Sequence, residues 1–291
     1  MKKIYWWKNY NILSTKRRID YNPKINYINK LESKLAKILK VKYVVYTTSG
    51  SSALTLAFFC TNINKKKKVI IPDRTWVATA HAAYNLNYDI QLEDTDLNTM
   101  LQNIPINQIK NKNNIGCLVL VNLNGRVNDA DKYKRIIKNK KIIIIEDNAQ
   151  SFLSARKNFV SPISKIACYS TGSTKLLNTL QGGFCATNDK KVFQRILLAR
   201  NHGIYDLFTD KWNSPGFNLK PNNFQCFLGL NELKIAHKKK RQCIKINNLY
   251  IKKITNKKVK LLTTKYEKGE FPIYVQALVD NKVKFKKYLS Q

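Results

Sequence analysis

Four groups of residues in the chain could together bind a molecule that is phosphorylated, planar and positively charged. Residues 49–54 read SGSSAL, a run of small residues entering a predicted helix, whose free N–H groups and dipole favour a phosphate. Trp76 offers a flat aromatic face, Asp147 a carboxylate, and Lys175 an amine after a run of hydroxyl residues. Pyridoxal 5′-phosphate (PLP) has all three properties, together with an aldehyde that forms an imine with lysine. The four groups therefore predict a PLP site.

Each of the four groups taken alone has an ordinary structural explanation. Serine and glycine often cap helices, and a carboxylate in a loop often caps a helix or a turn. A tryptophan such as Trp76 is often a core residue. Lys175 is one of 44 lysines, the number left when nine arginines are taken from the 53 Lys and Arg residues. It is the order and spacing of the four groups together that favour a shared site.

The elements that must position these residues alternate between short apolar runs and helical patterns. The runs predict strands near residues 42–48, 69–72, 88–96, 117–121, 142–146, 165–170 and 182–188. Their alternation with helical patterns of about a dozen residues predicts an α/β fold with a largely parallel sheet. Ligands of such sheets bind beyond the carboxyl ends of the strands, which is where the four groups fall.

The same patterns predict a division of the chain into an arm and two domains. We expect an N-terminal arm over residues 1–24, a PLP-binding large domain over 25–235, and a linking helix with an incomplete small domain over 236–291. The first helix of the large domain is predicted from Ile25 to Leu39, with an apolar face of Leu31, Leu35, Ile38 and Leu39. Later elements are predicted as a long helix from about residue 224, two strands near 260–264 and 271–280, and a helix near the end.

The composition is that of a folded protein without a membrane helix. The chain has 291 residues, of which 44% are hydrophobic, and its apolar runs are far shorter than the roughly 20 residues of a membrane span. The six cysteines form no CxxC pair and the three histidines are scattered, so we expect no metal site. The start has no signal-peptide pattern, and we expect a soluble cytoplasmic protein.

The net charge of +35 has two explanations. Lysine is spread over the whole chain, as in KKKK at 65–68 and HKKKR at 237–241, which favours solvated surface charge. The alternative is binding to a nucleic acid or another anionic surface, although such proteins usually depend more on arginine and gather their charge on one face. In either case the charge should attract an anionic ligand.

Several motifs at consistent spacing resemble the DegT/StrS family of PLP-dependent sugar aminotransferases. They run from about Trp7 to the end, and include VVYTTSGSSAL, IPDRTWVATAHAA, NGRVNDAD, IEDNAQS, YSTGSTK, QGGF, RNHG and PGFNLK. The resemblance implies fold type I, in which a mostly parallel seven-stranded sheet is flanked by helices and followed by a small domain. It also implies the function of the family, which is to transfer an amino group from glutamate to a nucleotide-linked keto-sugar for polysaccharide or glycoconjugate synthesis.

The resemblance also assigns roles around the cofactor ring. Lys175 would form the covalent imine bond to PLP, and Asp147 would pair with the pyridine nitrogen. Gln150 would contact the ring hydroxyl, and Trp76 would stack on the ring face. Some relatives are dehydratases with histidine in place of the lysine, so Lys175 favours transamination.

A further set of residues would hold the phosphate, by the same resemblance. Ser170 would bind it, together with backbone N–H groups around Ser51 and Ser52. Asn218 would reach the phosphate of a neighbouring subunit's cofactor, which implies a homodimer.

The chain also departs from the family pattern. Asn122 to Gly125 replaces a His-containing HxxG element, Gln181 replaces an acidic residue before two glycines, and Lys220 stands where arginine is common. Family members also extend well beyond residue 291. Two alternatives to an active aminotransferase therefore stay open: a PLP-binding but catalytically impaired or regulatory chain, and a basic nucleic-acid-binding protein.

Overall fold

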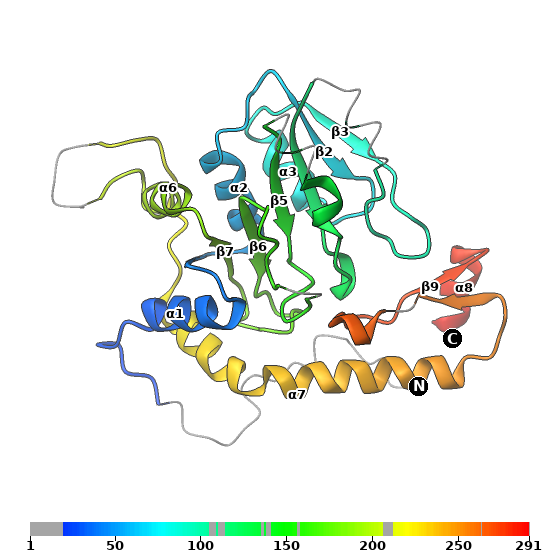
Figure 1. Ribbon diagram of the computed structural model, residues 1–291. Helices are drawn as coiled ribbons and strands as arrows, with labels where there is room; N and C mark the ends of the chain where they lie inside the picture. Colours follow the sequence, from blue (N-terminus) through cyan, green and yellow to red (C-terminus); the bar gives the residue numbers. More distant parts are fainter. Residues whose placement is uncertain are drawn as a thin grey trace.

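A sheet of seven strands forms the centre of the protein (Figure 1). The computed structural model describes residues 20–104, 109, 114–134, 137, 141–155, 158–205, 212–262 and 264–290. The strands follow the order β1-β7-β6-β5-β4-β2-β3, and β7 alone runs in the opposite direction to the other six strands. Their bounds are β1 Tyr43–Thr47, β2 Lys68–Pro72, β3 Ile90–Glu93, β4 Ile115–Val121, β5 Ile143–Asp147, β6 Ile166–Ser170 and β7 Gly183–Thr187. The predicted α/β class with a mostly parallel sheet is confirmed.

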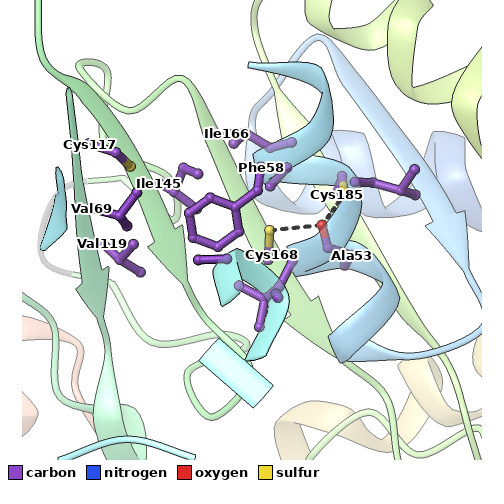
Figure 2. Close-up of a cluster of buried hydrophobic side chains, with 14 of the residues drawn as sticks. Ala53, Phe58, Val69, Cys117, Val119, Ile145, Ile166, Cys168 and Cys185 are labelled. Atoms are coloured by element: carbon purple, nitrogen blue, oxygen red, sulfur yellow. Dashed lines mark hydrogen bonds between the residues drawn. The ribbon is translucent and has the colours of Figure 1, made fainter. Parts of the chain in front are cut away.

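One face of the sheet is covered by α2 (Gly50–Cys60), α3 (Ala78–Tyr84) and α6 (Lys190–Arg200). Cys168 of β6 and Cys185 of β7 are paired in register, and both thiols donate to the carbonyl of Ala53, at 3.4 and 3.3 Å (Figure 2). Phe58 of α2 lies in the same buried cluster. These contacts hold the first turn of α2 against β6 and β7.

The opposite face carries α1 (Tyr27–Leu39) and α7 (Asn223–Lys253), which pack against each other (Figure 1). In α1 the buried residues include three of the four predicted apolar-face positions, Leu31, Leu35 and Leu39. The helix begins two residues later than predicted, because the side chain of Asn26 accepts the N–H of Asn29 and caps it.

The C-terminal part contains β8 (Val259–Leu261) and β9 (Ala277–Val279), paired antiparallel, and α8 (Lys282–Leu289). The two predicted strands exist but are short, and residues 271–276 are not part of a strand. The predicted boundary at residues 235 and 236 falls inside α7, and Leu262 and Phe271 pack into the cores on the two faces of the large sheet. The division into two domains stays a prediction.

Other predicted segments differ from the structure or lie outside it. The sequence DADKYKRIIKNK at residues 129–140 has a helical pattern; this segment is described only in part, and its described start is a 3₁₀ turn, η2 (Ala130–Tyr133). Two further 3₁₀ turns are η1 (Leu123–Gly125) and η3 (Tyr266–Lys268). Residues 1–19 of the predicted arm lie outside the described residues.

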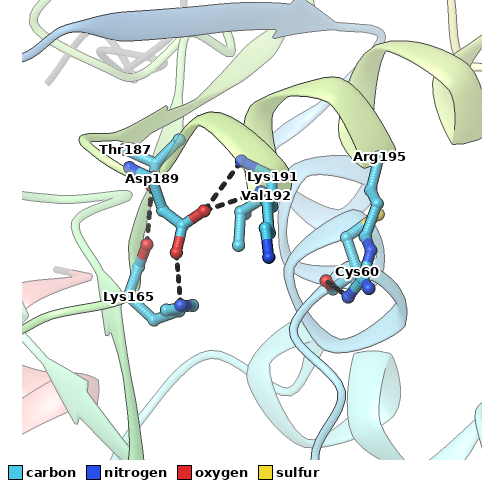
Figure 3. Close-up of polar contacts among 7 residues, drawn as sticks. All are labelled: Cys60, Lys165, Thr187, Asp189, Lys191, Val192 and Arg195. Carbon is cyan, nitrogen blue, oxygen red and sulfur yellow. Dashed lines mark hydrogen bonds and ion pairs between the residues drawn. The ribbon is translucent and has the colours of Figure 1, made fainter.

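The start of β6 and the adjoining end of β7 are tied to α6, and α6 is tied to α2, by polar contacts (Figure 3). The carboxylate of Asp189 accepts the N–H groups of Lys191 and Val192, which caps α6, and it also pairs with Lys165. Arg195 of α6 donates to the carbonyl of Cys60, at the end of α2, at 3.4 Å. These contacts fix α6 and α2 at the amino end of β6. The carboxyl ends of the parallel strands lie at the opposite side and carry no part of this network.

A buried ion pair between Arg200 and Glu32 gives a stability prediction. Its atoms are 2.8 Å apart, both side chains are 14% exposed, and both also bond the backbone of Tyr46. In Arg200→Met the buried carboxylate has no cation, so we expect the free energy of unfolding to fall by about 3 kcal/mol. Burial raises the pKa of Glu32, while the positive charge of Arg200 opposes this rise. The loss of unfolding free energy in Arg200→Met should therefore be smaller at acid pH, where the carboxyl of Glu32 is protonated and needs no cation.

Urea denaturation measured at pH 5 and pH 8 would test this prediction. Arg195→Met is the matched control, because Arg195 lies on the same helix and is exposed, and its guanidinium donates to a carbonyl at 3.4 Å. We expect the control to cost less than about 1 kcal/mol. Equal losses for the two variants would contradict a stabilising role for the buried pair.

Candidate active site

A cavity of about 1010 Å³ opens at the carboxyl ends of β1, β4, β5 and β6. All four groups of residues predicted to bind one ligand contribute to its wall. Of the eight predicted site residues, six line the cavity: Ser51, Trp76, Asp147, Gln150, Ser170 and Lys175.

One end of the cavity is built from the N-terminus of α2 and from Ser170. Ser49 caps the helix by accepting the N–H of Ser52 at 3.0 Å, and Gly50 and Ser51 of the first turn line the cavity. A Cβ atom on Gly50 would lie 2.7 Å from the Cβ of Ser170, so only glycine lets Ser170 lie this close to the helix. A helix N-terminus beside two serine hydroxyls is suited to a phosphate.

Lys175 lies in the loop that follows β6. Its N–H donates to the carbonyl of Gly172 at 2.9 Å, and the side chain of Asn178 donates to the carbonyl of Ser173, which holds the loop. Burial lowers the pKa of the Lys175 amine, and the nearby carboxylate of Asp147 partly opposes this. A lowered pKa increases the fraction of neutral amine, which is the form that attacks a carbonyl.

Asp147 ends β5 and is only 4% exposed. One carboxylate oxygen accepts the hydroxyl of Thr79 at 2.7 Å, and the other accepts the N–H of Ala149 at 3.0 Å. Burial raises the pKa of this carboxyl, while the two hydrogen bonds lower it. Among the described residues no Lys, Arg or His forms a salt bridge with it, so a cation in the cavity, such as a protonated ring nitrogen, would favour its ionised form.

Trp76 and Gln150 complete the wall around this carboxylate. Trp76 is 71% exposed although it lines a cavity, so its ring could be covered by a planar ligand. Gln150 accepts the N–H of Asn124 at 3.0 Å through its side-chain oxygen. Together with the anion site, the amine and the carboxylate, these residues fit the shape and charge of PLP.

Two predicted site residues do not line the cavity. Ser52 is the third residue of α2, and its N–H already donates to the side chain of Ser49, so it is not free for a phosphate. Asn218 is exposed, and its side chain accepts a hydrogen bond from Lys220 at 2.8 Å. Its predicted contact is with a neighbouring subunit, and this stays a prediction.

Several lining residues were not found from the sequence, among them Thr79, Ile246 and Tyr274. No local pattern singles out Thr79, because α3 begins only at Ala78 and Thr75, whose hydroxyl it contacts, lies before the helix. Ile246 and Tyr274 come from α7 and from the segment before β9, far along the chain from the other lining residues. No local pattern connects them with the site.

Within the described ranges, no three His, Cys, Asp or Glu side chains come together as metal ligands would. Over the same ranges, no helix combines the length and the apolar character that crossing a bilayer requires.

The hydroxyl of Thr79 gives a prediction about the charge of Asp147. Thr79 is fully buried and contacts the hydroxyl of Thr75 at 2.8 Å as well as the carboxylate. Thr79→Val removes a hydrogen bond to the ionised form, so the pKa of Asp147 should rise. We expect the acid limb of the pH–rate profile for amino-group transfer, the reaction that the resemblance implies, to move to higher pH. The rate of this reaction at neutral pH should fall about tenfold.

Thr79→Ser is the matched control for this prediction, because it keeps the hydroxyl and loses only a methyl group. It should keep the acid limb of the parent protein. If the valine variant also kept it, Thr79 would be a packing residue without influence on the carboxylate.

A family model matches almost the whole chain. The DegT/DnrJ/EryC1/StrS aminotransferase family model matches residues 20–290.

Curated relatives match a part of the chain at lower identity. The GDP-perosamine synthase of Escherichia coli O157:H7 is 28% identical over 213 residues, which cover 72% of this chain and 58% of the relative. The GDP-4-keto-6-deoxy-D-mannose 3-dehydratase of Escherichia coli O55:H7 is 27% identical over 234 residues, covering 72% of this chain and 60% of the relative. The chain therefore spans about three fifths of the length of these relatives.

Solved structures share the fold over most of the chain. DesV of S. venezuelae superposes with a TM-score of 0.82 and 19% identity, over 98% of this chain and 76% of that one. The E. coli GDP-4-keto-6-deoxy-D-mannose-3-dehydratase, solved with bound hydrated PLP, has a TM-score of 0.79 and 21% identity, over 92% and 75%. At these identities the likeness shows the fold alone, and the fold is that of PLP-dependent fold type I transferases.

Proposed function

The chain belongs to the DegT/DnrJ/EryC1/StrS aminotransferase family, and from this premise we propose that it is a PLP-dependent sugar aminotransferase. The observation that carries the proposal is the presence of Lys175, Asp147 and the N-terminus of α2 in the wall of one cavity. Each of these parts has a separate role toward one cofactor, and each comes from a different segment of the chain.

In this proposal the residues of the cavity bind and orient PLP. The first turn of α2 and Ser170 hold the phosphate, Trp76 covers one face of the ring, and Asp147 keeps the ring nitrogen protonated. When bound, PLP would supply an aldehyde that forms an imine with amines, and a ring that stabilises the negative charge left when the carbon bearing the amino group loses a proton. The amine of Lys175 first holds the cofactor and then, once displaced by an amino donor, its Nζ moves the proton at the reacting carbon.

The proposed acceptor is a nucleotide-linked keto-sugar, and the proposed donor is glutamate. The names of the relatives, a perosamine synthase and a keto-deoxymannose dehydratase that act on GDP-linked sugars, support this class of acceptor. The dehydration reaction is disfavoured by Lys175, since the resemblance places histidine there in dehydratases. A net charge of +35 would help to attract a sugar that carries a diphosphate. The product would serve polysaccharide or glycoconjugate synthesis.

We also propose that two copies of the chain share their sites and that they work in the cytoplasm. Asn218 is exposed and lies outside the cavity of its own chain, which suits a contact to the cofactor phosphate of a second copy. All six cysteines are free thiols, as is usual in a reducing compartment.

An assay with defined substrates tests this function. The purified protein would be incubated with PLP, glutamate and GDP-4-keto-6-deoxy-D-mannose or a UDP-linked keto-sugar. We expect 2-oxoglutarate and an amino-sugar nucleotide in equal amounts, detected by mass spectrometry. One round of 2-oxoglutarate formation without an amino-sugar from any acceptor would favour the catalytically impaired alternative. Absence of PLP binding, with DNA binding that weakens as salt rises, would favour the nucleic-acid alternative.

A further inference from the structure

Residues 271–276, which precede β9, are hydrogen-bonded to the turn that follows β4, and most of these bonds are made by the side chain of Asn124. The carboxamide oxygen of Asn124 accepts the N–H groups of Ile273 and Tyr274, at 2.9 and 2.8 Å. Its nitrogen donates to the carbonyl of Tyr274 and to the side-chain oxygen of Gln276, at 2.8 and 2.9 Å. Asn124 is fully buried, so both acceptor sites and both donors of its amide are used inside the protein.

The backbone around Asn124 brings the two segments into direct contact. Asn124 has the left-handed conformation (φ 52°, ψ 42°), which asparagine tolerates better than most residues, and Gly125 follows with φ 75°. A Cβ atom on Gly125 would lie 1.7 Å from the carbonyl oxygen of Phe271, so only glycine fits there. The guanidinium of Arg126 adds a hydrogen bond of 2.7 Å to Gln276. Residues 124–126 thus form a docking loop for residues 271–276.

The docking loop also contacts the cavity. The N–H of Asn124 donates to the side-chain oxygen of Gln150 at 3.0 Å. The oxygen and the NH₂ group of a carboxamide point in different directions, so fixing the oxygen fixes where the NH₂ group points. Gln150 lines the cavity, and an NH₂ donor there suits the ring oxygen of PLP, which is the contact that the family resemblance implies for this residue.

The docked segment itself reaches the same cavity. Tyr274 lines it, and the tyrosine hydroxyl donates to the carbonyl of Thr174, the residue before Lys175, at 3.4 Å. The segment therefore contributes to the wall of the cavity at Tyr274 and, through Asn124, holds Gln150.

We propose that Asn124 is a positioning residue that couples docking of residues 271–276 to cofactor binding. The proposal rests on the proposed function in so far as PLP is the ligand. Coupling between two binding events is reciprocal, so PLP should strengthen docking by the same factor by which docking strengthens PLP binding. The docked segment then places Tyr274 in the wall before the sugar substrate arrives.

Asn124→Gly separates the two contacts of this residue. Glycine adopts the left-handed conformation and keeps the N–H that reaches Gln150, but it removes all four side-chain hydrogen bonds to the docked segment. Asn87→Gly is the matched control, because Asn87 is an exposed asparagine with φ 57° in the turn after α3. Both substitutions add the same backbone freedom to the unfolded chain.

Hydrogen exchange and PLP titration would be measured on both variants and on the parent protein. In the absence of PLP, we expect the amides of Ile273 and Tyr274, which donate to Asn124, to exchange at least about tenfold faster in Asn124→Gly and at an unchanged rate in Asn87→Gly. The dissociation constant of PLP, followed by its visible absorbance, should rise about tenfold in Asn124→Gly alone. In the parent protein PLP should slow exchange of the same amides, a measurement that needs no variant to fold.

The outcomes separate the two proposals. Unchanged exchange in Asn124→Gly would overturn the docking role of the side chain. Faster exchange with an unchanged dissociation constant for PLP, or no effect of PLP on exchange in the parent protein, would overturn the coupling and leave the proposed function standing. A parent protein that binds no PLP would overturn the proposed function and the coupling together, while exchange in the ligand-free protein would still decide the docking.

Discussion

Replacing Lys175 with alanine should reduce the rate of amino-group transfer by about 10³-fold or more, because it removes the group that holds the cofactor and moves the proton. The fold should survive, since the described contacts that hold the loop use the backbone of Lys175 rather than its side chain. The rate of 2-oxoglutarate formation with glutamate and a keto-sugar nucleotide is the measurement.

The matched control for this variant is Lys240→Ala. Lys240 is also partly buried, its pKa is also lowered by burial, and it donates to the carbonyl of Leu153, outside the cavity. It therefore resembles Lys175 in being partly buried and in the lowered pKa of its amine, but it lies outside the cavity. We expect turnover to change less than about twofold, since the lost hydrogen bond contributes to stability rather than to the reaction. Similar losses for both variants would remove the special role of Lys175.

Replacing Asp147 with asparagine should also reduce the rate of amino-group transfer by about 10³-fold. This reduction corresponds to a loss of roughly 4 kcal/mol of transition-state stabilisation. The amide is nearly isosteric but carries no charge, so it cannot keep the ring nitrogen of PLP protonated. The cofactor should still bind, because the phosphate site and Lys175 are unchanged. The visible absorbance of bound PLP should change while its stoichiometry stays at one per chain.

The neighbouring carboxylate, Glu146, provides the control for this substitution. The two residues are adjacent in β5 and project to opposite faces of the sheet, Asp147 toward α3 and Glu146 toward Ser161, Ser164 and Asn148. Burial raises the pKa of both carboxyls. Glu146→Gln should lower thermal stability and leave the absorbance of bound PLP unchanged. If it changed that absorbance as Asp147→Asn did, the assignment of Asp147 to the ring would be wrong.

The sequence was sufficient to predict the parts of the site that lie at strand ends. Asp147 and Lys175 each follow a strand, and in a parallel sheet the carboxyl ends of neighbouring strands meet at one edge. The strand that carries Asp147 and the strand that precedes Lys175 are indeed neighbours, β5 and β6. Their placement in one cavity follows from that topology.

The parts that could not be predicted depend on contacts between distant segments. The docking loop at residues 124–126 and the docked residues 271–276 are separated by more than a hundred positions, and no local period connects them. The apolar alternation in FPIYVQALV favoured a single strand, but the N–H groups of Ile273 and Tyr274 are bonded to Asn124, and the strand begins only at Ala277. The side chain of Asn124 thus takes the backbone N–H groups that a strand over residues 271–276 would use for pairing, and no strand forms there.

A smaller difference concerns the phosphate end of the cavity. The run SGSSAL predicts a helix N-terminus correctly, but it does not say which serine is the cap. Ser49 is the cap, so the N–H of Ser52 is bonded within the helix and the groups left at the cavity are those of Gly50 and Ser51. If the helix were capped one residue later, the N–H groups left at the cavity would belong to different residues of the run.

The most direct test of the account is to map the lysine that holds the cofactor. The protein would be incubated with one equivalent of PLP near neutral pH, reduced with borohydride, digested, and analysed by mass spectrometry. We predict a single modified lysine, Lys175, because burial lowers the pKa of its amine and the cavity binds the cofactor beside it. Modification spread over many of the 44 lysines, or concentrated on a lysine outside the cavity, would contradict the account.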